Sequence, residues 1–340
     1  MIRSFNGETA DEAWRLSIQA LMDDGNVHVQ PSRLGPTREI LHATFSIQNP
    51  RQRWVLSRTP AINPAFAIAE VIWILLGRRD AAFLNFWNPI LPKFAGDGDT
   101  YHGAYGYRLR KHLGIDQIDR AYQVLSKTPD SRQLVLQIWD SCVDLPDSSG
   151  EPSAPDIPCN ICSMPKIRDG KLEWFQVMRS NDLFLGTPHN FIQFTTLQEI
   201  LAGWLGVDVG EYVQVSDSMH CYENDLKTFA SSGEPVTAPN TDNLAIPKPE
   251  SEAALSAIGS AMDKLRSPDL TPSDFSACLN EANLPEGYQN LLLITAADAA
   301  RRRGWTDEMA ATVSKCTNPA LTTAWERWEQ RNKSKPSKND

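Results

Sequence analysis

Apolar residues recur with helical spacing in four stretches of the chain, which predicts four helices. The predicted helices cover residues 8–24, 64–76, 116–127 and 191–206. The second stretch is apolar nearly all round, so we expect it to be buried, and Pro64 suits the first turn of a helix. Gly206 ends the fourth stretch and is the residue type that most often caps a helix C-terminus.

Four other stretches are rich in β-branched and aromatic residues, which is typical of strands. They cover residues 38–47, 133–140, 171–180 and 211–223. The helix and strand patterns do not alternate regularly along the chain. The sequence therefore predicts an α+β fold rather than a doubly wound fold.

The pattern changes near residue 235. Residues 236–252 are poor in apolar residues and rich in Pro, Ser, Thr and Asn, which predicts an irregular connection. Residues 253–330 carry helical patterns only, and the polar residues 331–340 predict a disordered tail. We therefore expect a mixed catalytic domain over residues 1–235, followed by a helical extension.

The composition limits the class of protein. A chain of 340 residues with 41% hydrophobic residues can bury a sizeable core. A net charge of −9 disfavours direct binding to a nucleic-acid backbone, whereas a small anion held by a few arginines remains compatible. No stretch approaches the roughly 18 apolar residues of a membrane span. We expect a soluble cytoplasmic protein, located in the host cytoplasm if its source is viral.

The stretch DIPCNICSMP carries Cys159 and Cys162 in C-x-x-C spacing. A structural zinc site would need a second ligand pair at short spacing, which the adjacent His220 and Cys221 do not provide. A thioredoxin-like redox pair would lie at a strand-to-helix turn, whereas a strand pattern follows here. A single nucleophile at Cys159 would need a nearby positive charge, for which Arg179 is a candidate. The pattern alone favours an exposed strand position for Arg179 over a role beside the thiol.

Seven segments of the chain occur in the order found in the thymidylate synthase superfamily. They lie within residues 20–235 and read SRLGPTRE, AEVIWILLG, GAYGYRLR, PDSRQLVLQIWD, IPCN, MRSNDLFLGTPHNFIQFTTLQEILA and HCYEND. The chain resembles this family, which implies a large bent mixed sheet flanked by helices and an obligate homodimer. The resemblance also implies one-carbon transfer from 5,10-methylenetetrahydrofolate to carbon 5 of a pyrimidine nucleotide, without a metal.

The resemblance implies roles for individual residues of this chain. Cys159 resembles the nucleophile that adds to carbon 6 of the pyrimidine, a role that calls for a thiol of lowered pKa. Glu70 and Tyr105 resemble the groups that order water and move protons. The positions that resemble ligand-binding residues are Arg33, Arg132, Arg179 and Ser180 for the phosphate, with Arg132 donated across the dimer, Asn190 for the base, His220 and Tyr222 for the sugar, and Asp182 and Gly186 for the folate.

Departures from the family pattern bear on the reaction. Leu91 stands where family synthases have a tryptophan that shields the intermediate from water, and the polar NKSKPSKND replaces their apolar C-terminal tail. These departures resemble the hydroxymethylase branch, in which water completes the reaction and the folate is released unoxidised. Asn160 replaces the histidine that usually follows the cysteine, and Gln133 replaces a second arginine, so this is a divergent member.

The amide at Asn190 can meet both the acceptor and the donor of uracil, whereas a carboxylate there would suit the amino group of cytosine. We therefore expect conversion of dUMP to 5-hydroxymethyl-dUMP, in a pathway that makes modified DNA precursors. Three alternatives remain. They are a thymidylate synthase whose appended helices replace the tail, a dCMP or CMP hydroxymethylase, and a catalytically silent nucleotide-binding relative.

Overall fold

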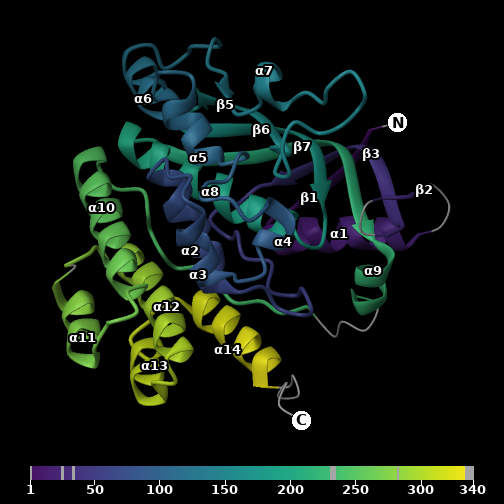
Figure 1. The fold of residues 1–340 in the computed structure, drawn as a ribbon. Coiled ribbons are helices and arrows are strands. Elements are labelled where there is room, and N and C mark those ends of the chain that lie inside the picture. The colour runs from purple at the N-terminus through teal and green to yellow at the C-terminus, as the bar shows by residue number, and fades with distance from the viewer. Residues whose placement is uncertain (1, 24–26, 33–34, 230–234, 282, 334–340) are drawn as a thin grey trace.

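A seven-stranded sheet forms the centre of the molecule (Figure 1). The computed structural model describes residues 2–23, 27–32, 35–229, 235–281 and 283–333. The strands lie in the order β1-β3-β7-β6-β5-β4, with β2 beside β3. Their bounds are β1 Arg3–Gly7, β2 His28–Gln30, β3 Thr37–Ile47, β4 Leu136–Gln137, β5 Asn160–Arg168, β6 Lys171–Asp182 and β7 Asp208–Tyr222.

The sheet is mixed and irregular. β1 pairs with β3, and β6 with β7, in parallel, while the other neighbours are antiparallel. The parallel pair β6 and β7 is joined through the long helix α8, Thr187–Leu205, as a parallel connection requires. The register shifts between Asn160 and Cys162 and between Leu172 and Trp174, and such irregularities bend strands. The predicted α+β fold with a mixed sheet flanked by helices is confirmed.

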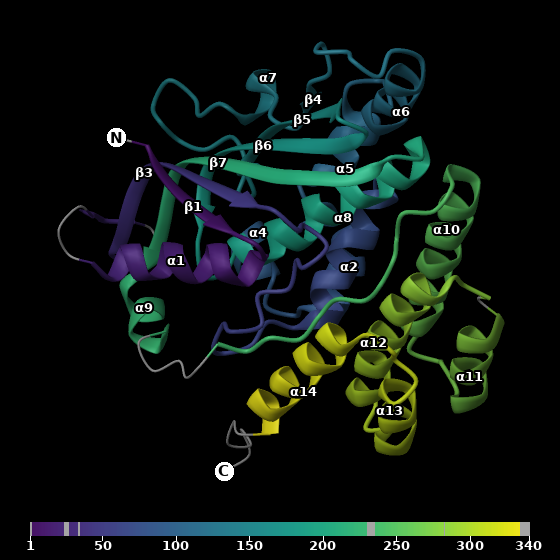
Figure 2. The ribbon, with the colours of Figure 1, turned by 180° about the vertical axis from the view of Figure 1, so that it is seen from behind.

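Two helices, α1 Ala10–Met22 and α8, pack on one face of this sheet, and α2 Pro64–Leu75 packs on α8 (Figures 1 and 2). As predicted, Pro64 occupies the first turn of α2, and all residues of this helix except Glu70 are buried. Gly206 caps α8 in the left-handed conformation, with φ 66°. Several of the largest fully buried side chains come from these helices and from the sheet, among them Trp14, Phe45, Phe191 and Tyr212.

Five helices follow in the C-terminal part of the chain and gather beside α2, on its side away from the sheet (Figure 2). They are α10 Lys248–Leu265, α11 Pro272–Glu281, α12 Glu286–Arg302, α13 Thr306–Val313 and α14 Pro319–Lys333. α10, α12 and α14 contact α2. α10 begins inside the segment predicted to be irregular, and α14 reaches into the predicted tail, whose residues 334–340 lie outside the described residues.

Buried charges tie the segment before α10 to α8. Glu199 of α8 is fully buried and forms ion pairs with Arg53 and, at 3.0 Å, with Arg51. Its other partner is the backbone amide of Leu244, which donates to Glu199 Oε1 at 3.0 Å. A buried carboxylate requires such partners.

Across the described residues, no helix is long and apolar enough to cross a membrane.

Several elements differ from the sequence-based expectation. The strand expected over residues 133–140 shortens to β4, while β1, β2 and β5 were not expected. The pattern of β5, NICSMPKIR, lacks the regular apolar alternation of a half-buried strand and contains a proline. The predicted helix at 116–127 is present as α6 Gln117–Lys127. Short unpredicted helices are α3 Ala81–Trp87, α4 Pro92–Ala95, α5 Tyr105–Tyr107, α7 Ser141–Asp144 and α9 Glu223–Phe229.

Gly106 in α5 is predicted to be intolerant of a side chain. A Cβ at this position would lie 2.2 Å from the carbonyl oxygen of Ile74 in α2, which is backbone and cannot rotate away. We expect Gly106→Ala to lower the free energy of unfolding by about 1–3 kcal/mol, as overpacking does. Gly98→Ala is the matched control, because its Cβ would make an ordinary 3.5 Å contact with Thr100. Denaturant titrations that gave both variants the same stability would contradict the prediction.

Candidate active site

Cys159 is the last residue before β5, and its backbone is fixed from two sides. The amide of Arg179 in β6 donates to the carbonyl of Cys159 at 2.9 Å. The strand irregularity follows at Asn160, and the carbonyl of Ile161 accepts the amides of Ile138 and Trp139 at 2.9 and 3.0 Å. The thiol is half-buried. These contacts hold Cys159 directly before the first residue of β5.

Cys159 and Cys162 do not form a pair. Both are free thiols, and Cys162 lies within β5, opposite Gln137 on one side and Val177 on the other. The part of the chain that the structure describes contains no group of three or more His, Cys, Asp or Glu residues that could hold a metal ion. Cys159 is therefore a single free thiol.

The Arg179 side chain lies against the segment that leads into Cys159. Its Nε donates to the carbonyl of Pro158 at 2.9 Å, and its Nη2 donates to that of Ile157 at 3.1 Å. The guanidinium also lies over the ring of Trp139, 5.5 Å from the centroid. The sequence left the position of Arg179 open, and the structure places its charge close enough to act on the Cys159 thiol.

The pKa of Cys159 is raised, not lowered. Burial of the thiol is the main cause, and the charges of Asp156 and Asp182 act in the same direction. Arg179 opposes them but does not reverse the sign. The expectation of a lowered pKa is therefore wrong for this structure, because desolvation of the thiolate outweighs one nearby guanidinium.

Tyr105 lies beside Cys159. Burial raises the pKa of its phenol far above the ordinary value, and the charge of Cys159 adds to the effect. Hydrogen bonds with the Asn160 side chain and the Cys159 backbone lower it only in part. The ring packs against Phe194 of α8, with centroids 6.1 Å apart. Tyr105 is therefore a neutral hydroxyl at neutral pH.

A chain of buried amides surrounds Asn190. Its Nδ2 donates to Asn181 Oδ1 at 3.2 Å, while its Oδ1 lies 3.4 Å from Asn160 Nδ2. Thr187 also donates to Asn181 Oδ1, and Gln176 Nε2 donates to Asn160 Oδ1 at 2.9 Å. These residues are at most 7% exposed. Mutual pairing fixes the orientation of each amide.

Asn181 and Gln176 were not among the residues singled out in the sequence. Their signal is a polar residue at an inward position of β6, since Gln176 continues the buried alternation of Leu172, Trp174 and Met178. A buried amide within an apolar strand face requires partners, and here those partners lie next to Cys159. A polar residue at an inward strand position therefore points to a polar site, but only once the bounds of the strand are known.

Asp182 ends β6 and organises the turn into α8. Its Oδ1 accepts the amides of Phe184 and Leu185 at 2.8 Å, and its carbonyl accepts the amide of Gly186 at 3.0 Å. Burial raises the pKa of this carboxyl. Asp182 pairs in register with His220 of β7, whose ring lies 5.9 Å from that of Tyr222.

Arg58 is a further charged group near Asp182 that the sequence analysis missed. Its Nε donates to the carbonyl of Phe184 at 2.7 Å, and its guanidinium lies 4.1 Å from the Phe184 ring centroid. Burial, together with the nearby Arg331 and against the opposing charge of Asp182, lowers the pKa of Arg58 to about 10. No motif surrounds Arg58 in the sequence.

Glu70 pairs with a residue that the sequence analysis did not assign. Its Oε2 lies 2.5 Å from Nδ1 of His189, at the start of α8. The ring of His189 lies 5.3 Å from that of Phe66, one turn before Glu70. Two predicted site segments, AEVIW and LGTPHN, thus meet through this pair.

The predicted phosphate-binding residues are not all brought together. Arg179 lies at the Cys159 segment, and the half-buried Ser180 pairs in register with Ser218. Arg132 is exposed in the segment before β4, and its assignment to a second subunit stays a prediction. Arg33 lies outside the described residues.

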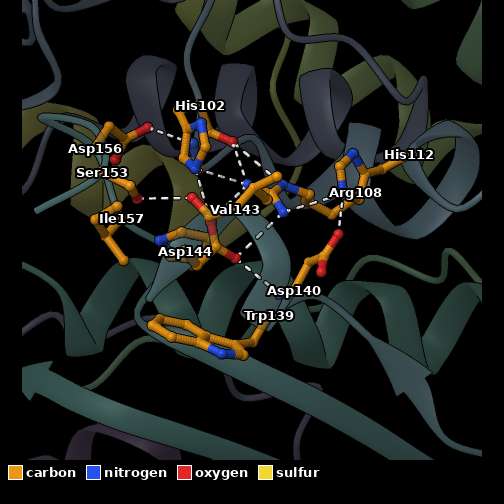
Figure 3. Close-up of polar contacts among 12 residues, drawn as sticks. His102, Arg108, His112, Trp139, Asp140, Val143, Asp144, Ser153, Asp156 and Ile157 are labelled. Atoms are coloured by element: carbon orange, nitrogen blue, oxygen red, sulfur yellow. Dashed lines mark hydrogen bonds and ion pairs between the residues drawn. The ribbon is translucent and has the colours of Figure 1, made fainter. Parts of the chain in front are cut away.

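A cluster of charged side chains supports the Cys159 segment (Figure 3). Asp144 is fully buried and accepts two hydrogen bonds from Arg108, at 2.8 and 3.2 Å, and one from His102, at 2.7 Å. It also accepts the amide of Asp140, whose carboxylate pairs with His112 at 2.7 Å. The five side chains converge in Figure 3 above the Trp139 ring.

The same cluster reaches the residues around Cys159. Asp156 accepts the amide of Gly103 at 2.9 Å, which joins the segment before the cysteine to the loop that carries Tyr105. Trp139, next to Asp140, lies under Arg179. The charged cluster therefore sets the relative positions of Tyr105, Arg179 and Cys159.

We expect Asp144→Ala to destabilise the protein by about 3–5 kcal/mol, because it leaves the buried Arg108 without its carboxylate. Asp217→Ala is the matched control. Asp217 pairs with His42 at 3.0 Å, but both side chains are more than half exposed, so its loss should cost less than about 1 kcal/mol. Urea unfolding of both variants measures the difference, and similar midpoints would contradict a structural role for Asp144.

Cys159 should be alkylated by iodoacetamide more slowly at neutral pH than the exposed Cys142. Because the pKa of Cys159 is raised, its alkylation rate should rise with pH above the range in which an ordinary thiol titrates. Because Arg179 favours the thiolate, Arg179→Gln should slow alkylation of Cys159 further, by up to about tenfold for one unit of pKa. Cys142 in the same sample is the internal control. Peptide mass spectrometry measures both rates, and an unchanged ratio in the variant would contradict the electrostatic role of Arg179.

Comparison with known proteins adds independent information. Residues 14–254 match the thymidylate synthase family. A deoxyuridylate hydroxymethyltransferase of Bacillus phage SP01 is 33% identical over 233 residues, which cover 65% of this chain and 59% of the relative. One of Pseudomonas phage M6 is 36% identical over 181 residues, covering 53% and 50%.

A thymidylate synthase of Francisella philomiragia subsp. philomiragia is 28% identical over 214 residues, covering 58% of this chain and 76% of the relative. The chain spans between 50% and 59% of the length of the phage relatives it matches. The family match extends over more than half of the chain and includes the strands β2 to β7, α2, α8 and the Cys159 segment. The chain belongs to the thymidylate synthase family.

Proposed function

We propose that this protein is a one-carbon transferase that converts dUMP, 5,10-methylenetetrahydrofolate and water to 5-hydroxymethyl-dUMP and tetrahydrofolate. Family membership supports a folate-dependent change at carbon 5 of a pyrimidine. The phage relatives named as deoxyuridylate hydroxymethyltransferases support water as the final reactant. The observation that carries the proposal is the placement of Cys159 beside Arg179 and Tyr105 in one buried polar site.

Each residue has a place in the proposed reaction. Cys159 Sγ bonds to carbon 6, and the displaced electron pair makes carbon 5 the nucleophile that takes the one-carbon unit. The proton of carbon 5 then passes to the water held near Glu70, and the protonated Tyr105 hydroxyl takes part in this network as a hydrogen-bond donor. As the folate nitrogen departs with the electrons of its bond, the pyrimidine keeps an exocyclic methylene group. Water adds to this carbon, and Cys159 leaves as thiolate.

The remaining predicted residues bind the substrates in this proposal. Asn190, fixed by Asn181 and Asn160, presents an amide that offers uracil both a donor and an acceptor. His220 and Tyr222 bind the sugar, and Asp182 with Gly186 faces the folate. The phosphate is held by Arg33, Arg179 and Ser180, together with Arg132 of a second subunit in a homodimer.

The position of Leu91 supports water as the final reactant, because this residue stands where family synthases have the shielding tryptophan. Leu91 precedes the short helix α4 and is only partly buried. The product would feed the synthesis of modified DNA in the cytoplasm.

The proposal predicts how tritium and folate products are coupled. With dUMP tritiated at carbon 5 and methylenetetrahydrofolate, we expect tritium release without dihydrofolate formation, and 5-hydroxymethyl-dUMP as the product. Cys159→Ser should release no tritium and form no covalent adduct with 5-fluoro-dUMP. Release with an equal amount of dihydrofolate would show a thymidylate synthase instead. Release from dCMP or CMP alone would show a cytosine hydroxymethylase, and no release from any of them a silent relative.

A further inference from the structure

The helix α2 and the Thr187–Ala202 part of α8 each contain one residue that is not buried. Every residue of α2 except Glu70 is buried, and so is every residue of α8 from Thr187 to Ala202 except His189. These two residues are each other's partners, with side chains 18% and 15% exposed. Solvent therefore reaches the contact between α2 and α8 at this pair, while the neighbouring residues of both helices are buried.

The hydrogen bond between His189 and Glu70 has a defined direction. A carboxylate only accepts hydrogen bonds, so Nδ1 of His189 carries the hydrogen in its 2.5 Å contact with Glu70. In the neutral tautomer this leaves a lone pair on Nε2, which no residue in the described ranges engages in a hydrogen bond. A carboxylate behind an imidazole fixes the tautomer and stabilises the imidazolium formed when Nε2 takes a proton.

The pair lies next to the proposed site. His189 precedes Asn190, whose amide contacts Asn160 beside Cys159. Ile74, one turn after Glu70, touches Gly106, the neighbour of Tyr105. Phe194, one turn after Asn190, packs on the Tyr105 ring. Contacts on both sides of the pair thus lead to Cys159 and Tyr105.

Asp156 and Asp182 also lie near the Cys159 thiol, but their carboxylates already accept backbone amides. The other polar groups around the thiol are poor bases. Tyr105 stays protonated, because burial raises its pKa far above neutrality. Asn160 and Asn190 are amides and do not titrate. His189 combines a lone pair, contact with solvent and a carboxylate that stabilises its protonated form.

We propose that His189, oriented by Glu70, is the base that takes a proton from the water that adds to the exocyclic methylene group. This inference rests on the proposed function. The water oxygen bonds to the methylene carbon as its proton moves to Nε2. The electron pair of the methylene double bond moves through carbon 5 toward the carbonyl at carbon 4 and returns to form the bond between carbons 5 and 6. The bond from carbon 6 to Sγ breaks, Cys159 leaves as thiolate, and His189 releases its proton to solvent.

His189→Phe tests the inference, because it keeps a ring against Phe66 and removes both nitrogens. The reaction with tritiated dUMP is run with 2-mercaptoethanol, a nucleophile that needs no protein base to attack the methylene carbon. We expect tritium release within about threefold of wild type, and a ratio of thioether to 5-hydroxymethyl-dUMP raised at least about tenfold, equivalent to roughly 1.4 kcal/mol in relative barrier. An unchanged ratio, or loss of tritium release in a variant that still forms the 5-fluoro-dUMP adduct, would overturn the inference.

A second variant separates a base from a positioning group. His189→Gln can still donate a hydrogen bond to Glu70 but cannot accept the proton, so we expect the same shift in ratio. A wild-type ratio in this variant would assign His189 to the positioning of Glu70 and overturn the inference. If His189→Phe does not form the 5-fluoro-dUMP adduct, the product ratio of His189→Gln is the test of the inference.

The control is His42→Asn, which removes a histidine from the exposed pair with Asp217 at a positive φ that asparagine tolerates. It should leave both tritium release and the product ratio unchanged. Failure of the proposed function is recognised separately, because the wild-type protein would then release no tritium from dUMP or would form dihydrofolate.

Discussion

The site depends on the antiparallel pairing of β5 and β6, which ends in the hydrogen bond from the Arg179 amide to the Cys159 carbonyl. Side chains alternate along a strand, so register decides which of them face the cysteine. A slip of one residue would replace the Arg179 guanidinium by Met178 or Ser180 and turn Gln176 away from Asn160. The fixed carbonyl of Ile161, which accepts two amides, anchors the strand at this point.

Buried polar groups make this arrangement rigid. Asn190, Asn181 and Asn160 satisfy one another, and Asp144 satisfies Arg108 and His102. Loss of any one member would leave its partners buried and unpaired, at about 1–3 kcal/mol for each group. Alternative orientations of the amides therefore have no comparable stability. A substrate meets donors and acceptors that are already in place.

The sequence was informative where periodicity and motifs extend over long segments. The apolar pattern of α2 predicted a buried helix, and the mixture of helix and strand patterns predicted the mixed fold. The same patterns left the position of Arg179 open. The strand β5 was not predicted, because apolar and polar residues alternate only weakly along it. The role of Asp144 was not predicted, because it lies far from His102 and Arg108 in the sequence and contacts them only in the folded chain. The sign of the Cys159 pKa shift depends on burial, which a motif does not reveal.

Whether water completes the reaction depends on where water enters the site, and not only on what covers it. Loss of a tryptophan and of an apolar tail would admit water without placing it. In this fold α2 and the Thr187–Ala202 part of α8 are buried except at Glu70 and His189, so the solvent-accessible position and the proposed base coincide. An apolar ring at position 189 would remove the base and leave the opening lined by carbon. The same two helices can therefore serve either outcome, and the residue at the start of α8 helps to decide between them.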